Sequence, residues 1–248
     1  KSRTTKLLVP STIGLFVFWW ISGYYNMAIG GAFENMSAIP KPILFVIMAI
    51  SGIGPLWYIQ LLWVFSLLLL FIRKIEKDRL YGLLEKTNLP VLLCLTLVIW
   101  GAAQILNTPV IVVYRFGIYG VGFFLGYFIF SHDAVMERLE KCWLLLFLAA
   151  LGLGIGFVFV FWGEPYAEHQ VLDTFLCNVY AWIATLAVLS VMKKWGNFEN
   201  SFSRFMGRKV WGIYLFHYLP LSACAWYLHL YISLPPLVMY LLVCATAF

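Results

Sequence analysis

Charged residues are scarce in this sequence, since Asp, Glu, Lys and Arg make up 11% of its 248 residues while hydrophobic residues make up 63%. A water-soluble domain carries about 25% charged residues. The scarcity therefore excludes a single water-soluble core and predicts an all-α bundle of transmembrane helices surrounded by membrane lipid. The net charge of +6 does not indicate a nucleic-acid partner, because the cations lie in short loops between apolar runs.

The sequence also lacks the common motifs for metal, disulfide and phosphate chemistry. It contains no C-x-x-C, H-E-x-x-H, G-x-S-x-G or P-loop pattern, and its five cysteines lie in or beside apolar runs. We therefore expect neither a bound metal nor a disulfide framework. Three glycines at 152, 154 and 156 resemble part of a nucleotide-binding loop. They fall inside an apolar run with no strand before them, which favours close helix packing instead.

The most informative run of sequence extends from residue 54 to residue 79. Between Pro55 and Ile72 it has no charge over eighteen residues, and four cations follow. A helix needs about 20 apolar residues to cross the bilayer, and flanking cations mark the cytoplasmic end. The run therefore predicts a span that enters from outside at Trp57 and Gln60 and ends inside.

Seven further apolar runs give a total of about eight expected spans with the N-terminal end inside. They cover residues 10–27, 89–106, 110–130, 143–162, 171–192 and 210–228, and the run after Pro235 and Pro236. Residues 28–54 are expected to form an external loop, with a re-entrant or interfacial piece at 43–50, which is too short to span. Residues 107–109 are expected to form an external turn.

The positions of the cations agree with this layout. All Lys and Arg except Lys41 and Arg115, that is 15 of the 17, fall in segments expected to be cytoplasmic. Such sorting is typical of the positive-inside rule. We also expect the single domain, 1–248, to be truncated at its N-terminus and its C-terminus, because it begins in a basic loop and ends inside an apolar run.

Arg115 is the cation expected within a span, one or two turns below the outer surface. An arginine at membrane depth costs roughly 2.5 to 3.5 kcal/mol on insertion scales unless it is paired or hydrated. Two interpretations remain open. Arg115 could line a cavity and hold an anionic group such as a phosphate or an oxyanion, or its side chain could reach up to the outer interface.

His217 lies near the middle of the run 210–228. A buried imidazole can act as a general base or a positioning donor, or it can form a hydrogen bond between helices, and the sequence leaves both open. His132 and His229 fall at span ends, which favours solvated roles. His169 and Asp173 form an H-x-x-x-D pattern seen in soluble acyltransferases, but four residues in an expected external loop are weak evidence.

Four segments, taken in order, resemble the acyltransferase-3 family of polytopic membrane enzymes. They are 3–10 (RTTKLLVP), 57–62 (WYIQLL), 116–127 (FGIYGVGFFLGY) and 203–220, which contains GIYLFH. The resemblance implies about ten spans and transfer of an acyl group, often acetyl, from a cytoplasmic donor such as acyl-CoA, with no bound cofactor. It also implies a catalytic histidine in the first span, which we expect to lie upstream of Lys1.

Carried over to this sequence, the resemblance gives roles to four residues. Arg3 would face the acyl-CoA side, although it fits plain positive-inside charge equally well. Trp57 and Gln60 would line the outer cavity for the acceptor, although tryptophan is also usual at the membrane interface. Arg115 would bind substrate, and Arg115 and His217 would support the chemistry.

The sequence therefore favours an integral-membrane O-acyltransferase of the cytoplasmic membrane. Its acceptor would be a hydroxyl of a cell-surface carbohydrate or a lipid-linked glycan. The alternative is a non-enzymatic transporter or flippase for a glycan or lipid. The sequence shows neither an internal repeat nor the paired broken helices found in transporters, so it gives that alternative no support.

Overall fold

A computed structural model describes residues 4–36, 39–54, 56–109, 113–164, 169–196, 198–231 and 235–246. The chain divides into two compact units, which are Lys1–Leu67 with Glu199–Phe248, and Leu68–Phe198. The predicted all-α class is confirmed, since the only sheet within these ranges has two short strands.

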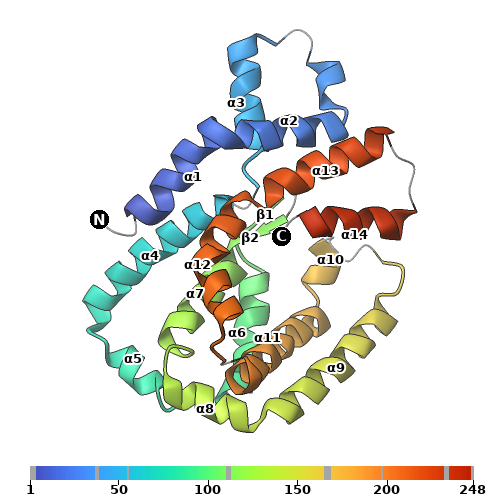
Figure 1. Ribbon diagram of the computed structural model, residues 1–248. Helices are drawn as coiled ribbons and strands as arrows, with labels where there is room; N and C mark the ends of the chain where they lie inside the picture. Colours follow the sequence, from blue (N-terminus) through green and yellow to red (C-terminus); the bar gives the residue numbers. More distant parts are fainter. Residues whose placement is uncertain are drawn as a thin grey trace. The chain divides into compact units, whose positions relative to one another are not determined.

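The first unit is built from helices at both ends of the chain (Figure 1). A helical run begins with a π-helical turn, Thr4–Leu8, and covers the expected span 10–27. Its further parts are α1 (Val9–Gly14), a second π-helical turn (Leu15–Trp19) and α2 (Trp20–Ile29). The other helices are a 3₁₀ turn (Ala32–Asn35), α3 (Lys41–Ser51), α4 (Leu56–Glu76), α12 (Ser201–Phe216), α13 (Tyr218–Tyr231) and α14 (Pro236–Thr246). α4 continues into the second unit.

Two glycines let α3 pack directly on the backbone of the first helical run. A Cβ added at Gly23 would lie 1.7 Å from the carbonyl oxygen of Met48, and one added at Gly52 would lie 1.9 Å from that of Trp19. Ala49 between these contacts is fully buried. The segment expected as a re-entrant or interfacial piece is therefore a helix held against α2, as Figure 1 shows.

The prediction of one unbroken helix over 210–228 was wrong. α12 ends at Phe216 and α13 begins at Tyr218, so the break falls at His217. The physical reason is Pro220, which has no N–H for the carbonyl of Phe216 four residues earlier and whose ring crowds that carbonyl. Pro220 is present in the sequence, but the prediction did not take into account that a proline breaks the preceding helical turn.

Within its described residues, the second unit contains nine elements after α4. They are α5 (Arg79–Leu84), α6 (Leu89–Ala103), β1 (Asn107–Pro109), β2 (Val113–Arg115), α7 (Phe116–Phe128), α8 (Asp133–Lys141), α9 (Trp143–Val160), α10 (His169–Leu172) and α11 (Phe175–Trp195), of which α10 is a single turn. Their apolar core includes Leu92, Ile129, Leu139 and Leu186. The buried indole of Trp182 donates a 2.8 Å hydrogen bond to the carbonyl of Leu92, which ties α11 to α6.

The start of the expected span 110–130 was also placed wrongly. Asn107 pairs with Arg115 in an antiparallel hairpin, and the helix begins only at Phe116. β-branched and aromatic residues such as Val113 and Tyr114 favour extended backbone. Gly117 then lies close to the end of α6, because an added Cβ would meet the carbonyl oxygen of Ala102 at 2.4 Å. The external turn expected at 107–109 is the first strand of this hairpin.

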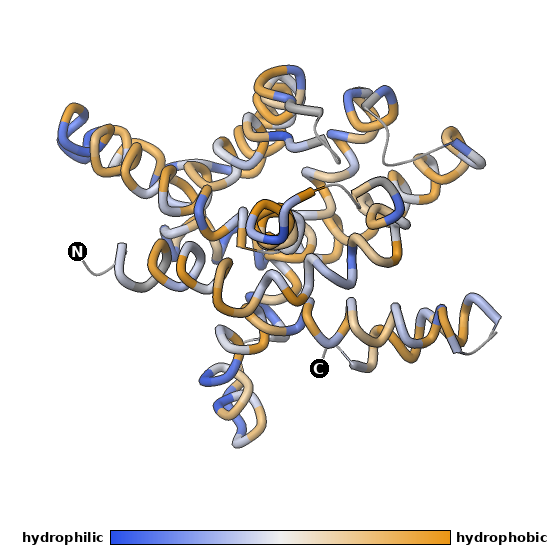
Figure 2. Tube along the Cα trace, turned by 90° about the horizontal axis from the view of Figure 1, so that it is seen from above, coloured by the Kyte–Doolittle hydropathy of each residue, from blue (hydrophilic) through white to orange (hydrophobic). Residues whose placement is uncertain are grey.

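Among the described residues, α4, α9 and α11 are each long and apolar enough to cross a membrane. A fourth crossing is possible if α7 and α8, bent by 102°, are taken together. The count of about eight spans is therefore not confirmed and stays a prediction. Figure 2 shows hydrophobic residues along most of the helices and hydrophilic residues gathered toward their ends.

Candidate functional site

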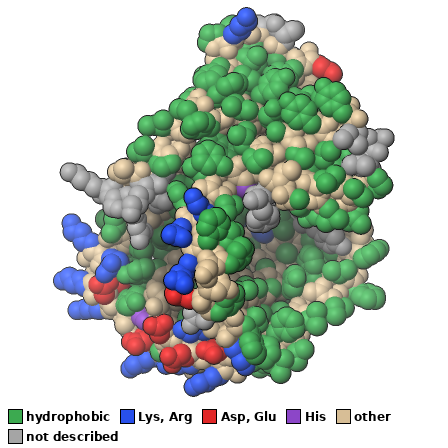
Figure 3. All heavy atoms as spheres, viewed as in Figure 1, with side chains coloured by type: hydrophobic (Ala, Val, Ile, Leu, Met, Phe, Trp, Pro, Cys, Tyr) green, Lys and Arg blue, Asp and Glu red, His purple; other side chains and the backbone are tan. Residues whose placement is uncertain are grey.

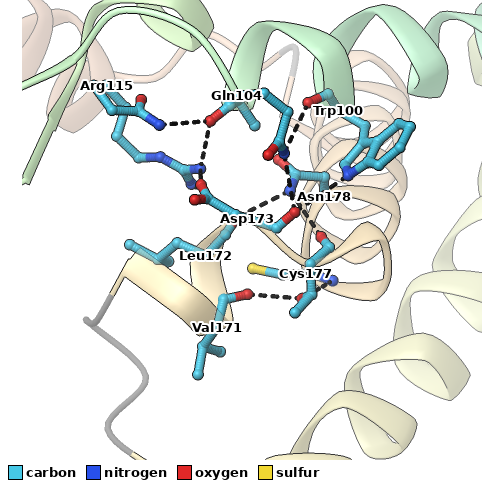
Figure 4. Close-up of polar contacts among 11 residues, drawn as sticks. Trp100, Gln104, Arg115, Val171, Leu172, Asp173, Cys177 and Asn178 are labelled. Carbon is cyan, nitrogen blue, oxygen red and sulfur yellow. Dashed lines mark hydrogen bonds and ion pairs between the residues drawn. The ribbon is translucent and has the colours of Figure 1, made fainter.

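Arg115 lies at the end of β2 and directly before α7, in the second unit. Its guanidinium forms an ion pair with Asp173, which lies between α10 and α11 (Figure 4). Nη1 donates to the carbonyl of Leu172 at 2.9 Å, and Nη2 donates to that of Ala103 at 3.0 Å. The side chain is 9% exposed, so the pair supplies the counter-charge that a buried arginine requires.

Further donors hold the turn that carries Asp173. Trp100 on α6 and Gln104 directly after that helix donate to the carbonyl of Asp173 at 3.2 and 3.0 Å. Asn178, which is 2% exposed, donates to the carbonyls of Leu172 and Thr174 at 2.9 and 2.8 Å. The cluster in Figure 4 therefore joins the hairpin, α6 and α11 through hydrogen bonds to backbone carbonyls.

This geometry limits what Arg115 can do in the state described. Both terminal nitrogens are engaged, whereas the buried Nε has no hydrogen-bond partner among the described residues. The observed contacts are those of a residue that holds the turns together. The two roles expected from the sequence, binding an anionic substrate group and supporting the chemistry, stay predictions.

His217 belongs to the first unit, at the break between α12 and α13. Its Nδ1 lies 2.9 Å from the carbonyl oxygen of Tyr214 and 3.1 Å from that of Ile213. Two carbonyl acceptors require a proton on Nδ1, so the neutral ring carries its lone pair on Nε2. The half-buried imidazole is thus held in the tautomer that a general base needs.

Aromatic rings surround this helix break. The ring of Tyr214 lies 6.0 Å from that of His217, and Tyr218 stacks on Trp19 with centroids 6.3 Å apart. Trp19 is 2% exposed. Gly54 has a φ of +40°, and a Cβ added there would lie 2.9 Å from the Tyr218 ring. The absence of a side chain at Gly54 therefore gives Tyr218 room beside α4.

Trp57 and Gln60 also lie in the first unit. The half-buried Trp57 packs edge-on against Tyr58, with centroids 5.7 Å apart. Gln60 donates to the carbonyl of Ser11 at 3.4 Å, and Trp63 one turn later donates to the hydroxyl of Thr4 at 3.2 Å. These contacts join α4 to the first helical run. The prediction that Trp57 and Gln60 line an acceptor cavity stays untested.

Three other expected features have different outcomes. Arg3 lies outside the described residues. The solvated role expected for His132 was wrong, because this residue is 8% exposed and its ring lies 4.1 Å from that of Tyr81, whereas His229 is exposed. Within the described ranges, no group of three or more His, Cys, Asp and Glu residues could hold a metal ion.

Asp173 is the site residue that sequence reasoning missed as a partner. It was considered only as part of the H-x-x-x-D pattern. The available signal was electrostatic, because a buried arginine near the outer surface needs an acidic residue on the same side. Asp173, at the start of the expected span 171–192, satisfied that condition.

A family model described as an acyltransferase domain matches residues 1–248, which is the whole chain. Neither the curated proteins nor the solved structures contain a match. The matched family and the apolar helices together indicate a membrane protein with acyltransferase chemistry. The chain belongs to the acyltransferase-3 family of membrane acyltransferases.

Proposed function

We propose that the protein is a multi-pass O-acyltransferase of the cytoplasmic membrane. It moves an acyl group, acetyl in the simplest case, from a cytoplasmic acyl-CoA to a hydroxyl of a cell-surface carbohydrate or lipid-linked glycan. The observation that carries the proposal is the acyltransferase match over the full chain. The cation distribution supports the proposed orientation, because loops rich in lysine and arginine usually stay on the cytoplasmic side of a membrane.

The proposed reaction is an ordinary acyl transfer. The acceptor hydroxyl gives its proton to an imidazole, its oxygen bonds to the thioester carbonyl carbon, and the carbon–sulfur bond breaks. The departing thiolate then takes up the proton. The principal base is proposed to be the histidine that the family resemblance implies for the first span, and His217 is proposed as a second imidazole that accepts a hydrogen bond from the acceptor through Nε2.

Three further residues have proposed binding roles. Arg3 would contact the phosphates of the donor, for which a guanidinium is suited. Trp57 would stack on the acceptor sugar, and Gln60 would donate a hydrogen bond to it. Gln60 can take this role only by leaving the carbonyl of Ser11, and their 3.4 Å contact is at the long end for a hydrogen bond.

The role of His217 is tested by His217→Asn in membranes that contain this variant in place of the native protein. The asparagine amide can still donate to the carbonyl of Tyr214, so the helix break is kept while the Nε2 acceptor is lost. Acyl transfer from labelled acetyl-CoA should fall about 10²-fold, the low end for general acid–base assistance. His229→Asn is the matched control, because His229 is exposed. Full activity of His217→Asn would remove His217 from the site.

A further inference from the structure

A shallow apolar groove of about 260 Å³ lies between α9 and α11 in the second unit. Its lining includes three alanines, Ala150, Ala184 and Ala187, and the larger side chains of Phe147, Val191 and Met192. No charged side chain lines it. Only 6% of the apolar window of α9 is buried within the protein, and this helix is long and apolar enough to lie in the hydrocarbon of a membrane. A hydrocarbon chain is the ligand that such a groove suits.

A hollow of about 510 Å³ with a different lining lies at the end of the same helix pair. Lys141 and Lys194 supply two positive charges there, Glu137 and Glu140 supply two negative ones, and Trp143 completes the wall. Figure 3 shows acidic and basic side chains gathered around α8, with hydrophobic side chains over neighbouring α9. The hollow therefore offers both signs of charge in equal number.

The groove and the hollow follow one another along the two helices. Trp143 of the hollow is four residues before Phe147 of the groove, which places both on one face of α9. On α11, Lys194 of the hollow comes three residues after Val191 of the groove, which places both on one face of that helix. The Nζ of Lys194 lies 4.4 Å above the Trp143 ring, and the ring of Trp195 lies 6.1 Å from that of Trp143. Tryptophan and lysine together are typical of the membrane interface, where lipid headgroups lie.

We propose that this surface binds one phospholipid whose headgroup carries both a phosphate and a primary ammonium. One acyl chain lies in the groove, and the headgroup lies in the hollow. The lysines bind the phosphate through charge-assisted hydrogen bonds, and the glutamates accept hydrogen bonds from the ammonium. A purely anionic headgroup would place its phosphate beside two carboxylates, and a quaternary ammonium has no N–H to donate to them.

Native mass spectrometry of the purified protein tests this proposal, with phosphatidylethanolamine, phosphatidylglycerol and phosphatidylcholine of the same acyl chains added separately. The structure predicts one retained phosphatidylethanolamine, bound about tenfold more tightly than either other lipid. Glu140→Gln should reverse part of this order of affinities, because it should weaken the binding of phosphatidylethanolamine and strengthen the binding of phosphatidylglycerol. Such a reversal cannot come from misfolding, which would weaken both.

Two further variants separate the groove from the hollow. Ala184→Phe should fill the groove and lower retention of phosphatidylethanolamine about tenfold, whereas Ala181→Phe on the exposed part of α11 should leave it unchanged. Lys194→Gln should weaken the binding of all three lipids, because each headgroup carries a phosphate, and exposed Lys86→Gln is its control. Equal retention of the three lipids, insensitive to Glu140→Gln, would overturn the proposal. The proposal would also be overturned if the purified protein were a dimer that Ala184→Phe dissociates, because the groove would then bind a second copy of the chain.

Discussion

Arg115 and Asp173 form a largely buried ion pair, with side chains 9% and 16% exposed, across 58 residues of sequence. The pair fixes the start of α7 against the start of α11. Because the arginine also donates to the carbonyls of Leu172 and Ala103, a single side chain joins three segments. The stability of the second unit should therefore depend on both partners.

Removal of either charge should destabilise the protein strongly. Asp173→Asn and Arg115→Ala should each cost about 3 to 5 kcal/mol, because an uncompensated charge or a set of unsatisfied carbonyls remains buried. Thermal unfolding in detergent measures the loss. The double variant should be less destabilised than the sum of the two single variants. Strictly additive losses of stability would show that the two side chains do not interact. Lys41→Ala is the control, because Lys41 is exposed and should have little effect on stability.

Gly54→Ala should destabilise the first unit through two separate effects. The backbone at φ +40° disfavours any residue with a Cβ, at about 1 to 2 kcal/mol. In addition, the new methyl group would press on the Tyr218 ring. Gly31→Ala isolates the first effect, because Gly31 has a φ of +65° and nothing within 4 Å of an added Cβ. Unfolding measurements should show that Gly54→Ala is clearly less stable than Gly31→Ala. Equal losses of stability would argue against the contact with Tyr218.

Two helical glycines should respond in opposite directions to the same substitution. Gly23→Ala would drive a methyl group into the carbonyl of Met48 and separate α2 from α3. Gly14→Ala meets nothing closer than 3.9 Å, so it should stabilise the helix by about 0.5 to 1 kcal/mol. A shift in unfolding temperature of the same sign for both variants would contradict the close approach of α2 and α3.

The pH dependence of stability should include a contribution from Asp78. The hydrogen bond from Arg73 holds the pKa of this carboxyl below its ordinary value of 3.8. The ionised form is favoured in the folded state, so the stabilisation is present above that value and is lost as the pH falls through the lowered folded-state pKa.

The matched variant for this effect is Asp78→Asn, since asparagine tolerates the left-handed backbone at φ 58°. The difference in stability between native protein and variant should shrink as the pH falls below about 4 and as salt is added. Both side chains are exposed, so the difference should be small. A difference that is constant from pH 6 to pH 2 would contradict the assignment.

The sequence was sufficient for the broad features of the fold and insufficient for local ones. Hydrophobic composition predicted an all-α membrane protein, and the apolar run before Arg73 predicted the helix α4. The hairpin at 107–115 was missed because a membrane-length apolar run outweighed the strand preference of Val113 and Tyr114. The helix break at His217 was missed because the span length was counted through Pro220.

The candidate site was predictable as a set of residues but not as a set of contacts. Arg115 and His217 stood out because polar side chains at membrane depth are costly. Their neighbours did not stand out, since no spacing in the sequence relates Arg115 to Asp173, or Gly54 to the Tyr218 ring. Those pairs arise from tertiary packing between distant segments.

The chemical fate of labelled acetyl-CoA tests the central claim most directly. Membranes with the native protein should transfer label from acetyl-CoA to glycan, and mild alkali should release it as acetate, because the product is an ester of a hydroxyl. His229→Asn should keep this transfer, and His217→Asn should lose most of it. Glycan that crosses the membrane without ever gaining alkali-labile label would contradict the account and favour a transporter.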